Sequence, residues 1–368
     1  MTEHHIETQY RPSSLSPPGD TLADLLEERA LRQNELATRM GVTPKFVNEL
    51  IAGKVAITPG TALALEKALG TSAAFWLSRD ARFQEAKARE EATEQLEQSV
   101  SWLDQLPLLD MRKFGWIKTA GRSAAVVEEC LRYFGVASVA AWQEHCVKEV
   151  QGAAYRASEK VKAKQGSVAA WLRAGELQAS HVECAPFDRD KFMAAVQEAR
   201  AMTVEREPSD YVPKLRKLFA ECGVAVVIVR APKGCPISGA VRWLSPNKAL
   251  IQLSVRQLSD DVLWFTFFHE CGHIALHGKK ILFLEESGMT EEHEQEANEF
   301  SRNRLIPPNK WSEFVSSNLA ITEPGIVQFA NSIGIAPSIV VGRLQHEKLV
   351  PYNRLNHLRV RYQWTEEA

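Results

Sequence analysis

The chain has 368 residues, of which 45% are hydrophobic and 24% are charged, and its formal net charge is −2. This length predicts two or three domains that can each bury a core, which excludes a chain that is disordered over most of its length. A nearly neutral balance also excludes a general binder of polyanions, because such proteins carry a large excess of Lys and Arg. Any contact with nucleic acid must therefore be local.

Several features of the sequence predict where the protein resides. The longest purely apolar run, residues 224–229, is much shorter than the roughly 20 residues that span a membrane. The N-terminus lacks the cationic start and apolar stretch of a secretory signal. The six cysteines form no Cys-x-x-Cys pair, which is typical of a reducing compartment. We expect a cytoplasmic protein that makes no contact with a membrane.

The N-terminal part of the chain reads as a flexible leader followed by short helices. Residues 1–19 are polar and rich in Pro and Ser, which predicts the leader. Further on, Thr43-Pro44 and Thr58-Pro59 each place a capping hydroxyl before a proline at the first helical position, which is a strong start signal. We expect four or five compact helices over residues 20–85.

Residues 33–54 read QNELATRMGVTPKFVNELIAGK and predict two short helices joined by a tight turn that contains Gly41. In this layout the second helix can enter the DNA major groove while the first crosses the backbone. Lys45 and Asn48 can face outward from the second helix. Asn can bond the edge of adenine and Lys can reach guanine or phosphate, so the chemistry suits DNA binding.

The strings NELATRMGV and ITPGTALALEKALGTSAAFWL resemble the Xre-type helix-turn-helix family, and within it the HigA-like antitoxins. The resemblance implies operator DNA as a partner and a DNA-facing set of five residues, Gln33, Thr43, Lys45, Asn48 and Lys54. Residues 20–85 carry eight Lys and Arg against nine Asp and Glu, a net of −1, so specific binding needs a homodimer on two half-sites. The alternative is a helical bundle that makes only protein contacts.

The region that follows, up to about residue 216, contains no motif that indicates a chemical function. Residues 84–98 are dominated by charge and lack Gly and Pro, which predicts a solvated helix that leads out of the first domain. The helical pattern continues to about residue 216, and the apolar runs 224–229 and 249–255 then predict two strands.

The densest group of functional residues lies within residues 261–277, DVLWFTFFHECGHIALH. His269 and His273 are four residues apart, hence on one face of a helix, and both can bind one zinc ion. Glu270 lies beside them and can take a proton from a zinc-bound water, whose pKa falls towards about 7, as that water attacks a peptide carbonyl. The motif therefore indicates a zinc-dependent hydrolase.

A third ligand is expected on a second helix, where residues 290–304 read TEEHEQEANEFSRNR. Glu296 lies three residues after His293, and both can face the first helix. Glu292 is a further candidate, whereas Glu294 is expected to point elsewhere. The spacing alone leaves the choice open.

The string FTFFHECGHIALH followed by EQEANEFSRNRLIPP resembles the ImmA/IrrE metallopeptidase domain, over roughly residues 218–350. The resemblance implies a gluzincin-like zinc endopeptidase with Glu270 as its general base. The zinc ligands that it implies are His269, His273 and Glu296. We interpret His277 as a supporting histidine and Cys271, between the ligands, as a packing residue.

Together these patterns predict a mainly α protein with a small α+β domain. The expected order is a leader (1–19), a helix-turn-helix bundle (20–85), a helical middle region (86–216), a zincin-like metallopeptidase domain (217–350) and a C-terminal tail (351–368). Such proteins resemble regulators of toxin–antitoxin or phage-related control. We expect a transcription regulator or antitoxin that autoregulates its operon and whose zinc domain senses or cleaves a protein partner, a toxin or a repressor. The alternative is a non-enzymatic antitoxin whose C-terminal domain masks a toxin, with zinc structural or absent.

Overall fold

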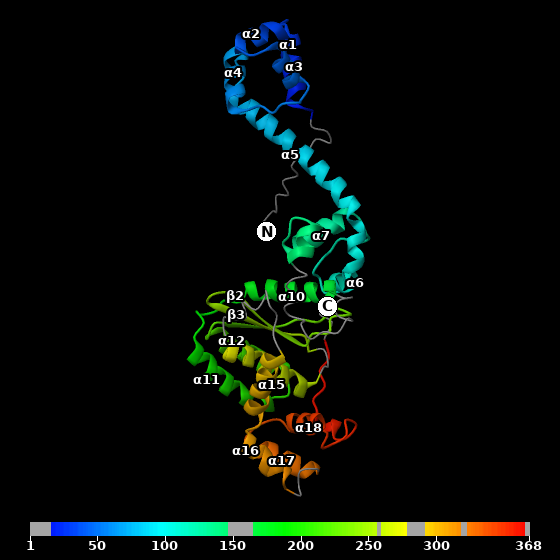
Figure 1. The fold of residues 1–368 in the computed structure, drawn as a ribbon, viewed down its shortest axis with the longest axis vertical. Helices are drawn as coiled ribbons and strands as arrows, with labels where there is room; N and C mark the ends of the chain where they lie inside the picture. Colours follow the sequence, from blue (N-terminus) through cyan, green and yellow to red (C-terminus); the bar gives the residue numbers. More distant parts are fainter. Residues whose placement is uncertain (1–15, 146–164, 256–258, 278–290, 318–321, 365–368) are drawn as a thin grey trace, which may run out of the picture. The chain divides into compact units, whose positions relative to one another are not determined.

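The computed structural model describes residues 16–145, 165–255, 259–277, 291–317 and 322–364 (Figure 1). The chain divides into two compact units, Met1–Gln98 and Ser99–Ala368. The described part is mainly helical and contains one three-stranded sheet, so the predicted fold class is confirmed.

The first unit is a helical bundle. Its helices are α1 (Pro18–Glu28), α2 (Gln33–Met40), α3 (Pro44–Ile51), α4 (Pro59–Leu69) and α5 (Ala73–Gln98). The Thr43 and Thr58 hydroxyls accept hydrogen bonds from backbone N–H groups at the starts of α3 and α4, as their Thr-Pro pairs predict. Leu36, Val47 and Trp76 are fully buried in the core that joins the helices.

The boundaries of this unit differ from those predicted. The predicted boundary at residue 85 falls inside α5, which runs without a break to Gln98 because no residue after 73 interrupts the helical pattern. Only Trp76 and Asp80 of α5 are buried. At the other end, α1 already begins at Pro18, inside the expected leader, and residues 1–15 lie outside the described part.

The second unit begins with the helices of the predicted middle region. They are η1 (Val100–Gln105), α6 (Leu108–Lys113), α7 (Ala124–Phe134), α10 (Gln165–Ser180), α11 (Arg189–Ala199), η2 (Arg200–Val204) and α12 (Pro208–Ala220). They belong to the same compact unit as the sheet, so the chain does not divide at the predicted boundary between residues 216 and 217. A contact that joins these helices to the sheet is made by α10, where Trp171 donates its indole N–H to the carbonyl of Val229, directly after the first strand, at 2.9 Å.

The sheet contains β1 (Val224–Ile228), β2 (Gly239–Ser245) and β3 (Lys248–Leu253) in the order β1-β3-β2. β3 pairs in parallel with β1 and antiparallel with β2. The sequence predicts β1 and β3 but misses β2, because this edge strand is mostly half-buried and lacks a continuous apolar run.

Both faces of the sheet are covered, which explains the continuous apolar run of β1. Val224 and Val226 belong to the large core that α12 and α13 (Asp260–Gly272) also build. α10 lies along the other face, whereas α12 and α15 (Glu291–Leu305) lie on the opposite side (Figure 1). α10 approaches closely at Gly175, where a Cβ atom would lie 1.9 Å from Oε1 of Gln252.

After α13, the chain makes one π turn, η3 (His273–His277), and later forms α15, which packs against α13. The remaining elements are α16 (Pro308–Val315), α17 (Glu323–Ile333), α18 (Pro337–His346) and η5 (Asn356–Leu358). The described part of the expected tail packs on this unit, because the Val360 amide donates to the Asp260 carboxylate at 3.1 Å.

The length and hydropathy of the described helices bear on whether any of them could span a membrane. None of them alone is long and apolar enough to cross a bilayer. The consecutive pair α17 and α18 meets the length and hydropathy requirement only jointly, and it is bent by 116°.

Candidate functional site

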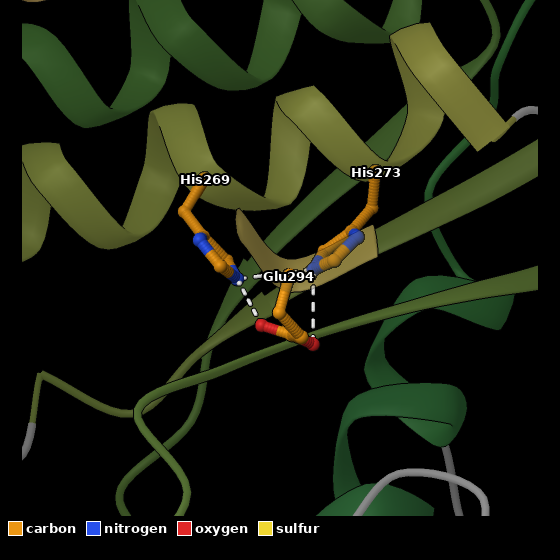
Figure 2. A group of neighbouring side chains, drawn as sticks. All are labelled: His269, His273 and Glu294. Carbon is orange, nitrogen blue, oxygen red and sulfur yellow. Dashed lines mark hydrogen bonds and ion pairs between the residues drawn. The ribbon is translucent and has the colours of Figure 1, made fainter. Parts of the chain in front are cut away.

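Two histidines and one glutamate converge where α13 meets α15. Nε2 of His269 lies 3.0 Å from Nε2 of His273. The carboxylate of Glu294 lies 3.1 Å from the first of these nitrogens and 3.5 Å from the second. Figure 2 shows both imidazoles pointing from one helix towards this carboxylate. His273 and Glu294 are buried, so the group is largely shielded from water.

The donor group fits zinc in both chemistry and spacing. Two imidazoles and one carboxylate are a known ligand set of catalytic zinc sites. Two donors that each bind zinc tetrahedrally at about 2.1 Å lie roughly 3.4 Å apart. The three separations here, 3.0, 3.1 and 3.5 Å, are close to that value.

Glu296, the predicted third ligand, does not lie at this site. Its carboxylate is half exposed and lies 2.9 Å from Nε2 of His277. Residues two apart on a helix point about 200° apart, so Glu294 and Glu296 cannot both face α13. The expectation that Glu294 points elsewhere is therefore wrong, because Glu294 faces the two histidines and Glu296 does not.

The other two candidates also lie outside the group. Glu292 is exposed to solvent. The ring of His293 packs edge-on against that of His277, with 4.6 Å between centroids. The described residues thus bring together His269, His273 and Glu294, and they leave Glu292, His293 and Glu296 at the periphery.

Small residues let α15 come close enough for Glu294 to reach the histidines. A Cβ atom on Gly272 would lie 3.1 Å from Cα of Ala297. The hydroxyl of Ser301 donates to the carbonyl of Phe265 at 2.9 Å, which ties the same two helices together one turn further on. These contacts fix how α15 is rotated about its own axis.

Each imidazole of the pair has a hydrogen-bonding partner on its other nitrogen. Nδ1 of His269 lies 2.9 Å from the amide oxygen of Asn298, which can only accept. This bond places the proton on Nδ1 and leaves the Nε2 lone pair free to bind a metal ion held by the group. Asn298 follows Glu294 by four residues, so one helix face supplies both groups; that spacing is the signal by which sequence reasoning could have found them.

The imidazole of His273 is held by His277, which in turn contacts Glu296. Nδ1 of His273 lies 3.2 Å from Nδ1 of His277, whose Nε2 faces the Glu296 carboxylate. If His277 donates from Nε2 to this acceptor, its Nδ1 accepts from His273, and Nε2 of His273 keeps its lone pair. His273 and His277 are the first and last residues of the π turn η3, and their side chains lie on neighbouring parts of its surface.

Glu270, the predicted general base, is buried beside the edge strand of the sheet. A Cβ atom on Gly239, the first residue of β2, would lie 2.4 Å from Oε1 of Glu270. Glycine at this position therefore lets the carboxylate lie directly against the strand. Sequence reasoning missed Gly239, because nothing local marks it as a neighbour of Glu270.

Cys271, between the two histidines, is fully buried. Burial raises the pKa of its thiol well above the ordinary value, and the nearby Glu270 charge raises it further. Cys271 belongs to the core cluster and not to the group of His269, His273 and Glu294, so it acts as a packing residue.

The second candidate site is formed by α2 and α3 in the first unit. α2 ends at Gly41, whose φ of 69° is the left-handed conformation that glycine adopts without strain. The Val42 amide then donates to the carbonyl of Ala37 at 3.0 Å, which closes the turn. Leu36 and Val47 are fully buried and hold the two helices together.

The predicted DNA-facing residues are all exposed, namely Gln33, Thr43, Lys45, Asn48 and Lys54. Lys45 lies 3.7 Å from Glu49, but 84% of its side chain is exposed, so this ion pair is weak and the ammonium can reach a phosphate. The Thr43 hydroxyl accepts from the Phe46 amide at 3.2 Å, which gives this residue a capping role as well.

Comparison with known proteins places this second site in a family. Residues 22–76 match the helix-turn-helix family model, so the first unit contains a helix-turn-helix domain. A curated relative, the uncharacterized HTH-type transcriptional regulator YddM of Escherichia coli (strain K12), is 34% identical over 61 residues. That alignment covers 17% of this chain and 65% of the relative, which is less than two thirds of the relative's length.

Proposed function

We propose that the chain is a transcription regulator that binds operator DNA through its first unit and carries a zinc-dependent, peptidase-like site in its second unit. The observation that carries this proposal is the presence in one chain of a helix-turn-helix domain and of the converging group His269, His273 and Glu294. The second site would sense or cleave a protein partner, and the first would repress the regulator's own operon.

The DNA-binding part rests on the match of residues 22–76 and on the exposure of α3. The N-terminal residues of a second, recognition helix contact base edges in this motif, and Lys45 and Asn48 lie at such positions. Because the segment 20–85 carries a net charge of −1, we infer that a homodimer contacts two half-sites.

The metal-binding part rests on the donor geometry. His269, His273 and Glu294 would hold the ion, and zinc bound there would supply a Lewis acid. A structural zinc site usually has four protein ligands, whereas three ligands leave one position open for chemistry. Glu270 is a buried carboxylate that follows the first ligand in the sequence, and this carboxylate would take a proton from the attacking water.

A peptide is the substrate class that the sheet favours. Within the described residues, β2 is an edge strand that pairs only with β3. An edge strand can pair with an extended peptide through backbone hydrogen bonds. Since Gly239 of β2 lies against the Glu270 carboxylate, a peptide that extends the sheet would pass beside the proposed general base.

Two experiments test the two halves of the proposal. The full chain should shift a fragment of its own promoter in a gel, and the absence of any shift would refute the DNA-binding part. The zinc-loaded chain should cleave the protein encoded by the adjacent gene, whereas Glu270→Gln should bind zinc and not cleave it. If both proteins bind zinc, neither cleaves and both neutralise a toxin, the non-enzymatic antitoxin replaces the peptidase.

A further inference from the structure

A groove runs between α13, α15 and α18 on the second unit. One part of it has a volume of about 380 Å³ and reaches Arg359 near the C-terminus. The other part has a volume of about 360 Å³ and reaches Asn298. Both parts are lined by Phe265, Arg302 and His346, so they form one continuous groove along α13.

The groove combines an apolar floor with charged walls, in which cationic side chains outnumber the acidic Asp261 and Glu291. Val262, Phe265 and Ile339 supply apolar surface from α13 and α18. Its cationic side chains are Arg302, Arg343, Arg359 and, where it is protonated, His346. Volumes of this size and lining of this kind are typical of sites for small organic ligands.

The positive charges of the groove are only partly balanced. Arg359 lies 2.9 Å from Asp261, and Arg343 lies 2.9 Å from Glu347. Arg302 is half-buried, and no acidic side chain of the described chain forms an ion pair with it. Burial lowers the pKa of Arg343 and the charge of Arg302 lowers it further, although Glu347 opposes both effects. Arg302 and Arg343 line the same part of the groove, so an anion bound there would reduce the repulsion between their guanidinium groups.

We propose that this groove binds a small organic acid, whose carboxylate pairs with Arg302 and whose apolar body lies on Phe265 and Val262. A guanidinium presents a planar fork of N–H donors that matches a carboxylate with two parallel hydrogen bonds. In a partly buried position such a charged pair contributes more than it does on an open surface.

The groove also contacts a residue that holds one histidine of the proposed metal site. Asn298 lines it and bonds His269 at 2.9 Å, and Arg302 lies four residues further along the same helix, α15. A ligand that binds Arg302 can therefore shift α15, the helix that also carries Asn298 and Glu294. We infer that the acid is an effector that changes zinc affinity; this second step rests on the proposed zinc site, whereas binding of the acid does not.

The binding step is tested by calorimetric titration of the metal-free full chain with phenylbutyrate and with its neutral isostere phenylbutyramide. The acid should bind, and the amide should bind about tenfold more weakly or not at all, because it cannot pair with the guanidinium. Arg302→Gln should weaken binding of the acid by a similar factor. Equal binding of acid and amide, or no binding of the acid, would overturn the proposal.

Two further variants separate the groove from general effects on the fold. Arg304→Gln removes a cation from the same helix, outside the groove lining, and should leave binding of phenylbutyrate unchanged. Val262→Trp should fill the groove and abolish binding while the circular dichroism spectrum stays that of the wild type. Unchanged binding by Val262→Trp would place the acid elsewhere.

The effector step is tested separately by chelator competition for zinc with and without phenylbutyrate. A reproducible change in zinc affinity, absent in Arg302→Gln, is expected. Binding of the acid with unchanged zinc affinity would overturn the effector step alone, and a chain that binds the acid but no zinc would overturn the proposed metal function instead.

Discussion

Nδ1 of His269 lies 2.9 Å from the amide oxygen of Asn298, so the helix that carries Glu294 also orients one of the two imidazoles that Glu294 faces. The two contributions lie one turn apart on α15, at residues 294 and 298. Rotation of this one helix would therefore move a candidate ligand and the support of another together.

Replacing Asn298 with Ala should weaken zinc binding by roughly 10- to 100-fold, because loss of the acceptor frees the His269 ring to rotate and to change tautomer. The measurement is competition with a chromophoric chelator. Asn298→Asp keeps an acceptor and should retain most of the affinity. The exposed Asn303 lies on the same helix, and Asn303→Ala should behave as the wild type; equal affinities for all three variants would contradict this role of Asn298.

Gly239 is expected to be intolerant of any side chain. Gly239→Ala would place a methyl group 2.4 Å from the Glu270 carboxylate and 2.6 Å from Cγ2 of Thr266, so one of them must move. We expect this overpacking to lower the free energy of unfolding by about 1 to 3 kcal/mol, measured by urea denaturation. Gly60→Ala is a matched control, because its added methyl group would meet nothing closer than 3.9 Å. A Gly239→Ala protein as stable as the control would show that Glu270 does not need the strand to be this close.

Two substitutions on α3 should affect DNA binding in different ways. Asn48→Ala should cost about 1 to 3 kcal/mol on the operator and relax its sequence preference, because an amide that reads a base edge is lost. Lys45→Ala should weaken binding to all sequences alike and reduce the salt dependence by about one phosphate contact. Fluorescence anisotropy with promoter DNA at several salt concentrations separates the two effects.

The control for these variants is Lys67→Ala, which removes an exposed cation from α4. It should change affinity less than Lys45→Ala does. If all three proteins bind the promoter as the wild type does, α3 is not the recognition helix.

The features that could be predicted from the sequence are those encoded by neighbouring residues. Gly41 and Thr43 define a turn and a helix start through their own backbone and side-chain chemistry, and both are found as expected. His269 and His273 share one helix, so their spacing alone brings them together. Their convergence needs no knowledge of the rest of the fold.

The features that were missed depend on contacts distant in the sequence. Whether Glu294 or Glu296 faces α13 depends on how the two helices pack, through contacts such as that of Gly272 with Ala297. The four-residue spacing of Glu294 and Asn298 marks one candidate face of α15, but it does not by itself show that this face meets the histidines. The edge strand β2 is recognisable only through its pairing with β3. The grouping of the middle helices with the sheet could not be predicted, because contacts such as that of Trp171 with Val229 join residues far apart in the sequence.

The zinc affinity of the full chain, compared between Glu294→Gln and Glu296→Gln, decides whether His269, His273 and Glu294 form a zinc site. Both substitutions remove one negative charge from α15, but only Glu294 faces the two histidines. We expect about one zinc ion per chain in the wild type. We also expect a severe loss of affinity in Glu294→Gln and a smaller loss in Glu296→Gln, which acts only through His277. A chain that keeps its zinc in Glu294→Gln but loses it in Glu296→Gln, or a wild type that binds none, would contradict the proposed site.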